Sequence, residues 1–132
     1  MKKTADTKKE IGDLGERRAA RYLMLRGYLI KERNWRAGKA EVDIIAETLR
    51  EVVFVEVKTR TYQKEALLTA PPPGVAVNAN KQRVTRQAAR QYLYQHRTNK
   101  QPRMDVIEVW LCKDREEDAP HVAKIHHIKA AY

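Results

Sequence analysis

The sequence predicts an α/β fold in which one mixed β-sheet is flanked by helices. Two observations carry this prediction: a helical pattern precedes three strand patterns, and, after a run of prolines, a second helical pattern precedes two more. The chain has 132 residues, 42% of them hydrophobic, which suits one domain with one packed interior. We therefore expect a single domain over residues 11–132, after a flexible, basic arm at residues 1–10.

The first element is predicted to be a helix over residues 9–26, because Gly27 follows it and glycine commonly comes after a helix. One stripe of this helix is apolar and should face the core; it contains Ile11, Leu14, Tyr22 and Leu25. Glu16 lies on a neighbouring strip with Ala19, Ala20 and Leu23. Glu16 is therefore expected at the margin of the buried face, where another group can approach it closely.

Strand patterns occupy the next part of the chain, at residues 28–33, 41–47 and 52–60. A polar turn that contains Trp35 is expected at residues 34–39, between the first two strands. Only a short polar segment separates the second strand from the third. This spacing predicts that the two strands form an antiparallel hairpin.

The second half of the chain begins after residues 70–74, which must form a loop because consecutive prolines cannot donate to a strand ladder. A second helix is predicted from a cap at Asn78 or Asn80 to about residue 96. Its apolar stripe contains Val84, Ala88 and Tyr92. Two further strands are expected, at residues 104–111 and 122–128.

The hairpin brings charged side chains together, because side chains alternate between the two faces of a strand. One face is wholly apolar, with Val42, Ile44, Ala46, Val53, Val55 and Val57. If residues 48–51 close the hairpin, Asp43 lies opposite Glu56 and Glu41 lies opposite Lys58. This register is an assumption, supported by the fact that a shift of one residue would move charges onto the apolar face.

Two acids directly opposite each other on a sheet are destabilising, so Asp43 facing Glu56 requires an explanation. A divalent cation such as Mg²⁺ provides one, because carboxylates would coordinate it and it would activate a water and polarise a phosphate. Lys58 would then orient the attacking water, and Glu16 would act through water or on the nucleophile. The alternative is an ordinary ion pair between Glu56 and Lys58 on a solvated face, which contributes little.

A basic surface accompanies these acids, since the chain has a formal net charge of +10. Residues 66–104 contain no Asp or Glu. The second helix has a ridge of cations that could contact nucleic-acid phosphates: Lys81, Arg83, Arg86 and Arg90. Three more cations lie near the acids and could extend this surface: Arg36, Lys39 and Arg60. The alternative for this ridge is a solvated helix face.

The residues present exclude several other classes of protein. Cys112 is the one cysteine, so the chain can form no internal disulfide and no cysteine-based zinc site. Serine is absent, which excludes a serine nucleophile. No stretch has the roughly 20 apolar residues of a membrane span, so we expect no membrane partner. The single cysteine and an N-terminus without the apolar core of a secretory signal predict a cytoplasmic protein.

Several motifs resemble the YraN family: Gly15-Glu16, Asn34-Trp35-Arg36, the run EVDIIA at residues 41–46 and the run FVEVKTR at residues 54–60. The resemblance covers roughly residues 11–132. Members of this family are small bacterial proteins regarded as similar to Holliday-junction resolvases and, more broadly, to the restriction-endonuclease-like superfamily. The resemblance implies a restriction-endonuclease-like sandwich, with Glu16, Asp43, Glu56 and Lys58 at the positions of the nuclease acids and lysine.

Together these observations predict a metal-dependent endonuclease that hydrolyses phosphodiester bonds in DNA, with branched or repair intermediates as candidate substrates. Catalysis is assigned to Glu16, Glu41, Asp43, Glu56 and Lys58. Mg²⁺ or Mn²⁺ would be held by Asp43, Glu56 and the carbonyl of Val57. The runner-up is a non-catalytic module that recognises DNA structure for a partner protein, and a third hypothesis is an assembly protein with an acidic partner. The chain is expected to be a monomer or a homodimer.

Overall fold

A computed structural model describes residues 7–70 and 77–132 of the chain, and it has the predicted α/β architecture. Its elements, in chain order, are α1 (Lys8–Leu25), β1 (Leu29–Ala37), β2 (Ala40–Glu47), β3 (Glu51–Gln63), η1 (Lys64–Thr69), α2 (Ala79–Gln95), β4 (Gln101–Lys113) and β5 (His121–Ile128). The strands form one sheet in the order β1-β2-β3-β4-β5, in which β3 and β4 are parallel and the other neighbours antiparallel. The predicted mixed sheet is therefore confirmed, and η1 is an addition.

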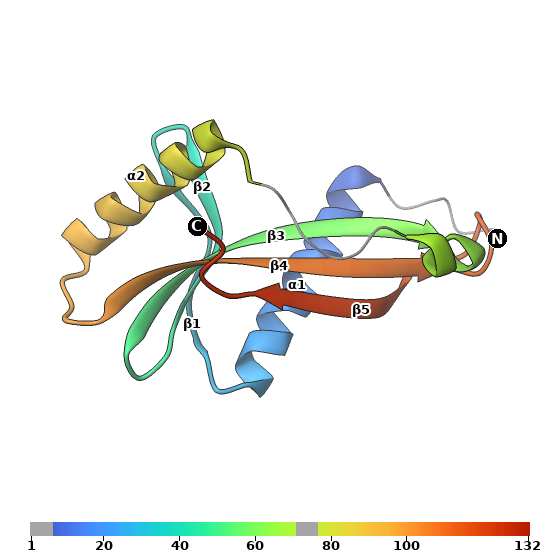
Figure 1. Ribbon diagram of the computed structural model, residues 1–132, viewed down its shortest axis with the longest axis horizontal. Helices are drawn as coiled ribbons and strands as arrows, with labels where there is room; N and C mark the ends of the chain where they lie inside the picture. The colour runs from blue at the N-terminus through green and yellow to red at the C-terminus, as the bar shows by residue number, and fades with distance from the viewer. Residues whose placement is uncertain (1–6, 71–76) are drawn as a thin grey trace.

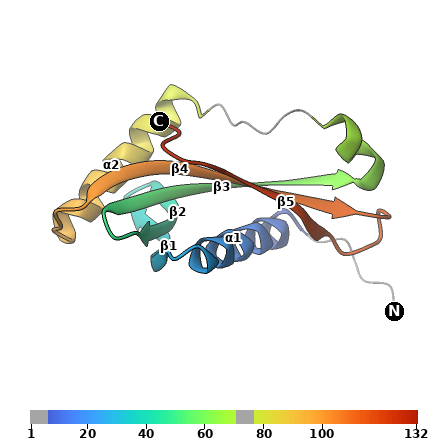
Figure 2. The same ribbon diagram turned by 60° about the horizontal axis from the view of Figure 1, so that its bottom comes forward.

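The two helices cover opposite faces of this sheet, as Figure 2 shows most clearly. Figure 1 shows β3, β4 and β5 running side by side as long strands, while β1 and β2 turn away from them at one end. One core layer packs under α1 and includes Ile44, Val55 and Ile107. The other packs under α2 and includes Ile45, Phe54 and Met104. Within the described residues, no helix is both long and apolar enough to cross a membrane.

Helix α1 begins at Lys8 because Thr7 caps it: the Thr7 hydroxyl accepts from the amide of Glu10, and the Glu10 carboxylate accepts from the amide of Thr7. Residues 8–10, expected in the arm, are therefore helical, and residues 1–6 lie outside the described residues. The strip that contains Ala19, Ala20 and Leu23 lies with Gly15 at the centre of the buried face, and Glu16 is half-buried at its margin, as predicted. Leu25, expected to face the core, is 75% exposed because the helix ends there.

Strand β1 is longer than predicted, because residues 34–37, expected in a turn, continue the ladder with β2 as far as Ala37 opposite Ala40. The side chain of Trp35 explains the extension. It lies opposite Val42 and packs edge-on against Tyr92 of α2, with ring centroids 5.4 Å apart. Burial of this large aromatic surface stabilises the strand in a segment that is otherwise polar.

The predicted hairpin register is confirmed from Ile44 opposite Val55 to Glu47 opposite Val52. It does not continue to the expected Asp43–Glu56 and Glu41–Lys58 pairs, because the ladder of β2 with β3 ends at Ile44. Beyond that point the alternation of β2 also changes. Val42, expected on the face of Ile44, packs instead in the core layer under α2.

Helix α2 starts as predicted, because the Asn78 side chain accepts from the amide of Lys81 at 2.8 Å. Ala88 and Tyr92 are buried as expected, whereas Val84 is only half-buried and Thr85 takes the central place. The expected loop at residues 70–74 falls almost wholly on residues 71–76, which lie outside the described residues.

Candidate functional site

The site lies where β2 and β3 stop pairing. Just beyond the last backbone pair, Oδ2 of Asp43 accepts a hydrogen bond from the amide of Val57 at 2.8 Å. A side-chain carboxylate thus takes the amide that a strand partner would otherwise use. This bond fixes Asp43 against β3, and it explains why the expected backbone pair with Glu56 does not form. It uses the amide of Val57 and leaves the carbonyl, the predicted metal ligand, uninvolved in this bond.

Glu56 is held on the neighbouring part of β3 by two lysines. It is 8% exposed, and its Oε1 lies 3.2 Å from Nζ of Lys58 and 3.7 Å from Nζ of Lys81 on α2. Its second oxygen, Oε2, is buried without a hydrogen-bond partner. Buried carboxylate oxygens normally have partners, so an unpartnered one marks a place where a ligand could bind.

Glu16 reaches this region because Gly15 lets α1 approach β3. A Cβ on Gly15 would overlap Oγ1 of Thr59 and lie 2.9 Å from the Thr59 Cβ. Burial, and then the charge of Asp43, raise the pKa of Glu16 to about 7. A carboxyl group of this kind exchanges its proton near neutral pH, as a general base must.

Asn34 connects two of the acids and was missed by the sequence reasoning. With its amide nitrogen facing them, it donates to Oε1 of Glu16 at 2.8 Å and to Oε1 of Glu41 at 3.1 Å. Its backbone has a φ of 51°, a left-handed conformation that asparagine adopts more readily than other residues with a side chain. The Asn34-Trp35-Arg36 motif was the available signal, but it did not reveal which residues Asn34 contacts.

Neighbouring acids add to the raised pKa values of Glu16 and Asp43. Burial is the largest cause of the raised pKa of Asp43, and the charges of Glu56 and Glu41 add to it, while the Val57 amide and Lys81 oppose it. Glu41 itself lies 3.7 Å from Nη2 of Arg36. Clustered acids of this kind are unusual unless they bind a cation or exchange a proton.

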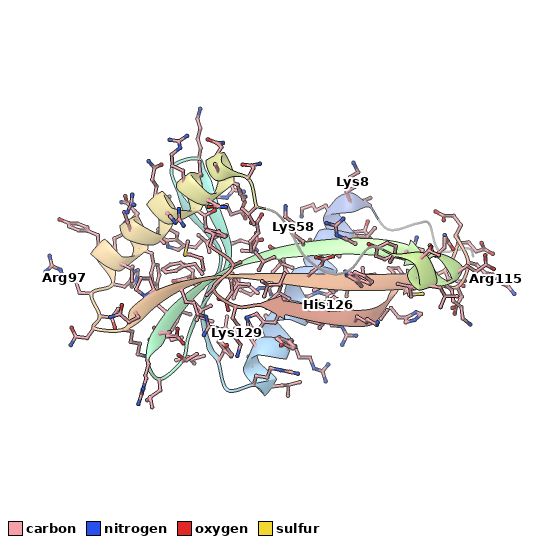
Figure 3. The ribbon with its side chains drawn as sticks, viewed as in Figure 1. Lys8, Lys58, Arg97, Arg115, His126 and Lys129 are labelled. Atoms are coloured by element: carbon pink, nitrogen blue, oxygen red, sulfur yellow. The ribbon has the colours of Figure 1, made fainter. Side chains whose placement is uncertain are left out.

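A cleft of about 760 Å³ collects most of the predicted site, since Glu16, Glu41, Asp43, Val57 and Lys58 all line it together with Asn34 and Arg36. Glu56 is buried beside the cleft and does not line it, although its charge acts on Asp43. Figure 3 shows Lys58 and Lys8, both lining residues, on the same side of the long strands.

The donor set suits a hard divalent cation, because carboxylate oxygens are what Mg²⁺ and Mn²⁺ prefer. Across residues 7–70 and 77–132, no three His, Cys, Asp or Glu side chains form a group that could hold a metal ion. A pair of carboxylates, Asp43 and Glu56, therefore fits such an ion only with a backbone carbonyl, water or substrate oxygens completing the shell. Magnesium sites in proteins often have this composition.

The predicted phosphate-contacting residues are exposed, but they are not equivalent. On α2, Arg83 donates to Oδ1 of Asn80 at 2.7 Å, and Lys81 belongs to the acid cluster. Arg60 is tied to the buried carboxylate of Glu108, with Nε 2.9 Å from Oε1. The remaining members, Arg36, Lys39, Arg86 and Arg90, lie on the surface at the β1–β2 turn and along α2.

Comparison with known proteins gives a consistent result. A model of the family described as "Uncharacterised protein family UPF0102" matches residues 15–109. A UPF0102 protein of Caldanaerobacter subterraneus subsp. tengcongensis is 38% identical over 100% of this chain and 100% of its own length. Another, from Alkaliphilus oremlandii, is 39% identical over 94% of this chain and 98% of its own, and one from Porphyromonas gingivalis is 43% identical over 78% and 73%.

Proposed function

The chain belongs to the uncharacterised protein family UPF0102, and we propose that it is a metal-dependent endonuclease that hydrolyses phosphodiester bonds in DNA. The observation that carries the proposal is the meeting of Glu16, Asp43, Glu56 and Lys58 at the end of the β2–β3 ladder, in a chain with a net charge of +10. The proposal includes a restriction-endonuclease-like fold related to the resolvases, as the YraN resemblance implies.

Asp43 and Glu56 would hold Mg²⁺ or Mn²⁺, with the carbonyl of Val57 as a third ligand. When bound, the ion would polarise the scissile phosphate and lower the pKa of the attacking water. The unpartnered Oε2 of Glu56 and the raised pKa of Asp43 support this assignment, because a cation would coordinate the former and favour the ionised form of the latter.

Lys58 would orient the nucleophile and balance the charge that develops on the phosphate, because its flexible ammonium lies at the boundary between Glu56 and the cleft. Glu16 would accept the proton of the nucleophile, since its pKa of about 7 matches that task. Asn34 would set the orientation of Glu16, and Glu41 would complete the acidic surroundings.

Phosphates would follow the exposed cations: Arg36, which lines the cleft, Lys39 in the β1–β2 turn, and Arg86 and Arg90 along α2. Contacts of this kind fix the position of a strand and read no base. Binding should therefore be insensitive to sequence and should weaken steeply with salt. Symmetric cutting of two strands would need two copies of the chain.

The experiment is cleavage of labelled linear, single-stranded and four-way-junction DNA with Mg²⁺, Mn²⁺ or EDTA. We expect metal-dependent cutting that falls at least about a hundredfold in Asp43→Ala, Glu56→Ala and Lys58→Ala, while DNA binding persists. Matched controls are Glu117→Ala and Lys129→Ala, which remove exposed charges outside the cleft. If Asp43→Ala, Glu56→Ala and Lys58→Ala cut DNA as fast as the wild type, the assignment of these residues to the site is wrong.

The second candidate, a module that recognises DNA structure for a partner protein, is favoured by the exposed cations Arg86 and Arg90 of α2, in a chain with a net charge of +10. It predicts DNA binding that needs no metal and survives loss of the acids. Binding without cutting in any metal would promote it. If the chain is instead an assembly protein with an acidic partner, we expect no DNA binding that weakens steeply as the salt concentration rises.

A further inference from the structure

A second hollow, separate from the acidic cleft, lies between α2, the start of β4 and the C-terminal residues. Its volume is about 290 Å³, near the lower end of small-ligand pockets. Ala89, Leu93 and Met104 provide apolar walls, and Arg86, Arg90 and Tyr132 add cations and an aromatic ring. We call this hollow the α2–tail pocket. Its composition suits a flat, apolar group attached to an anion.

The wall formed by the last residues is fixed by hydrogen bonds. The amide of Ala131 donates to the carbonyl of Met104 at 2.7 Å, and the amide of Ala130 donates to Oδ1 of Asp105 at 3.0 Å. These bonds place the ring of Tyr132 against α2, where the guanidinium of Arg86 lies 5.5 Å from the ring centroid. The pocket is thus formed before any ligand binds, which lowers the entropic cost of binding.

The α2–tail pocket lies along α2 from the acidic site. Lys81 contacts Glu56 at 3.7 Å, and Arg86 and Arg90 follow it on the same helix. At about 1.5 Å per helical residue they lie about 7.5 and 13.5 Å beyond Lys81. These distances correspond to about two and four steps of a strand at a rise of about 3.4 Å. Burial, and to a smaller extent the charge of Glu56, raise the pKa of Tyr132, which agrees with its ring lying near the site.

We propose that the α2–tail pocket binds an unpaired nucleobase of the strand that passes the acidic site, so that the favoured substrate has unpaired nucleotides close to the bond that is cut. This inference rests on the proposed function and adds a substrate class to it. Bases stack on aromatic and arginine side chains regardless of sequence, while Arg86 and Arg90 would meet the adjoining phosphates. A base in a continuous duplex could enter only by leaving its stack, which costs energy.

The test measures binding by fluorescence anisotropy in EDTA, so that no strand is cut. The probes are a labelled single-stranded oligonucleotide, a duplex of the same sequence, and versions of the single strand with one abasic position moved along it. The Ala89→Leu variant fills the pocket with an apolar side chain, and Tyr132→Ala removes the stacking ring without crowding the core. Gln87→Leu, on the exposed side of α2, is the matched control.

We expect Ala89→Leu and Tyr132→Ala to weaken single-strand binding about tenfold, or about 1.4 kcal/mol, and to change duplex binding less than about twofold. One abasic position should weaken binding of the wild type and have no further effect in the two variants. If Ala89→Leu does not fold, the single-strand binding of Tyr132→Ala alone decides whether the pocket binds a base. An abasic series without a position effect, or two folded variants that bind single strands like the control, would overturn the inference.

Failure of the pocket and failure of the nuclease give different results. If cutting depends on metal but binding does not depend on the position of the abasic nucleotide, the proposed function stands and base binding in the α2–tail pocket is wrong. If one position of the abasic nucleotide weakens binding but no metal supports cutting, base binding in the pocket stands and the nuclease proposal is wrong. No binding to any DNA would overturn both.

Discussion

Two aspartates on the sheet, Asp43 and Asp105, have opposite surroundings. Asp105 on β4 is fully buried and surrounded by donors: Arg103 at 2.8 and 2.7 Å, His127 at 2.6 Å and the amide of Ala130 at 3.0 Å. Asp43 accepts a hydrogen bond from the amide of Val57 and lies among other acids. The donors around Asp105 outweigh the cost of burying its charge, whereas the Val57 amide and Lys81 do not outweigh it at Asp43.

The pKa values of the two groups are shifted in opposite directions, as these surroundings would produce. Burial alone would raise the pKa of Asp105, but hydrogen bonds with His127 and Arg103 outweigh it and hold the pKa below its ordinary value. Burial raises the pKa of Asp43, and neighbouring acids raise it further. The contrast indicates that Asp105 stabilises the fold, while the cluster around Asp43 is retained at a cost in stability, as functional sites commonly are.

The Asp105 network also explains how the ends of the fold are joined. Arg103 donates to Oε1 of Glu51 at the start of β3 and to the hydroxyl of Tyr28 before β1, both at 2.8 Å. One guanidinium thus connects three parts of the chain that are far apart in sequence. The α2–tail pocket depends on this network as well, because the amide of Ala130 is bound to Asp105.

The largest expected effect comes from replacing the two aspartates in turn. Asp105→Asn should destabilise the protein by about 3 kcal/mol or more, because Arg103 and His127 would be left without their buried anion. Asp43→Asn should change stability by less than about 1 kcal/mol, because it removes repulsion as well as a charge. Urea unfolding at neutral pH measures both, with the exposed Asp114→Asn as control. Equal losses at the two sites would refute the comparison.

A second prediction concerns the contact that brings Glu16 to the cluster. Gly15→Ala should destabilise the protein by about 1–3 kcal/mol and impair cleavage, because α1 must move away from Thr59. Adding Thr59→Ala should recover part of the stability, since the overlapping Oγ1 would be removed. Gly12→Ala is the control, because its Cβ would meet nothing within 4 Å. A Gly15→Ala protein as stable and active as the control would rule out this contact.

A third prediction uses pH to separate the two kinds of acid in the metal-free protein. The pKa of Glu16 is raised from 4.5 to about 7, so its contribution to stability is full below pH 4.5 and is lost as pH rises through about 7. Asp105 behaves oppositely, because its stabilisation is present above its unfolded pKa and is lost as pH falls through the lower folded pKa. Unfolding from pH 4 to 8 should therefore show Glu16→Gln gaining relative to the wild type as pH rises.

Carbon-13 NMR of the glutamate side chains provides the direct measurement of this titration. Glu16 should titrate near pH 7 without metal, and added Mg²⁺ should lower its midpoint, because a cation favours the ionised form. A midpoint near 4.5 in the metal-free protein would contradict the assignment.

The smallest expected effect concerns Asn34. Asn34→Gly keeps the left-handed backbone but removes the amide between Glu16 and Glu41, so stability should fall by about 1 kcal/mol or less. The informative readout is the NMR midpoint of Glu16, which should rise because a donor to its ionised form is gone. Asn34→Asp provides the contrast and should raise that midpoint more. No shift in either variant would show that Asn34 does not hold Glu16.

The sequence by itself determined the order of the helices and strands, the hairpin register around Ile44 and Val55, and the apolar face of that hairpin. These features follow from short-range patterns: alternation in strands, three- and four-residue spacing in helices, and caps such as Asn78. It also identified Glu41, Asp43, Glu56 and Lys58, because their spacing on two adjacent strands is a local property. Helical spacing and the motif resemblance both indicated Glu16.

Only the tertiary structure decided which of these groups meet, and how. The approach of Gly15 to Thr59, the bond from Val57 to Asp43, the bridge from Asn34 and the packing of Trp35 on Tyr92 each join residues that sequence spacing does not relate. The same is true of Asp105, which in the sequence is one acid in an apolar strand. Whether a buried charge is satisfied depends on the hydrogen-bond donors that the whole fold places around it. These donors come from residues distant in sequence, so the local pattern of a strand does not predict them.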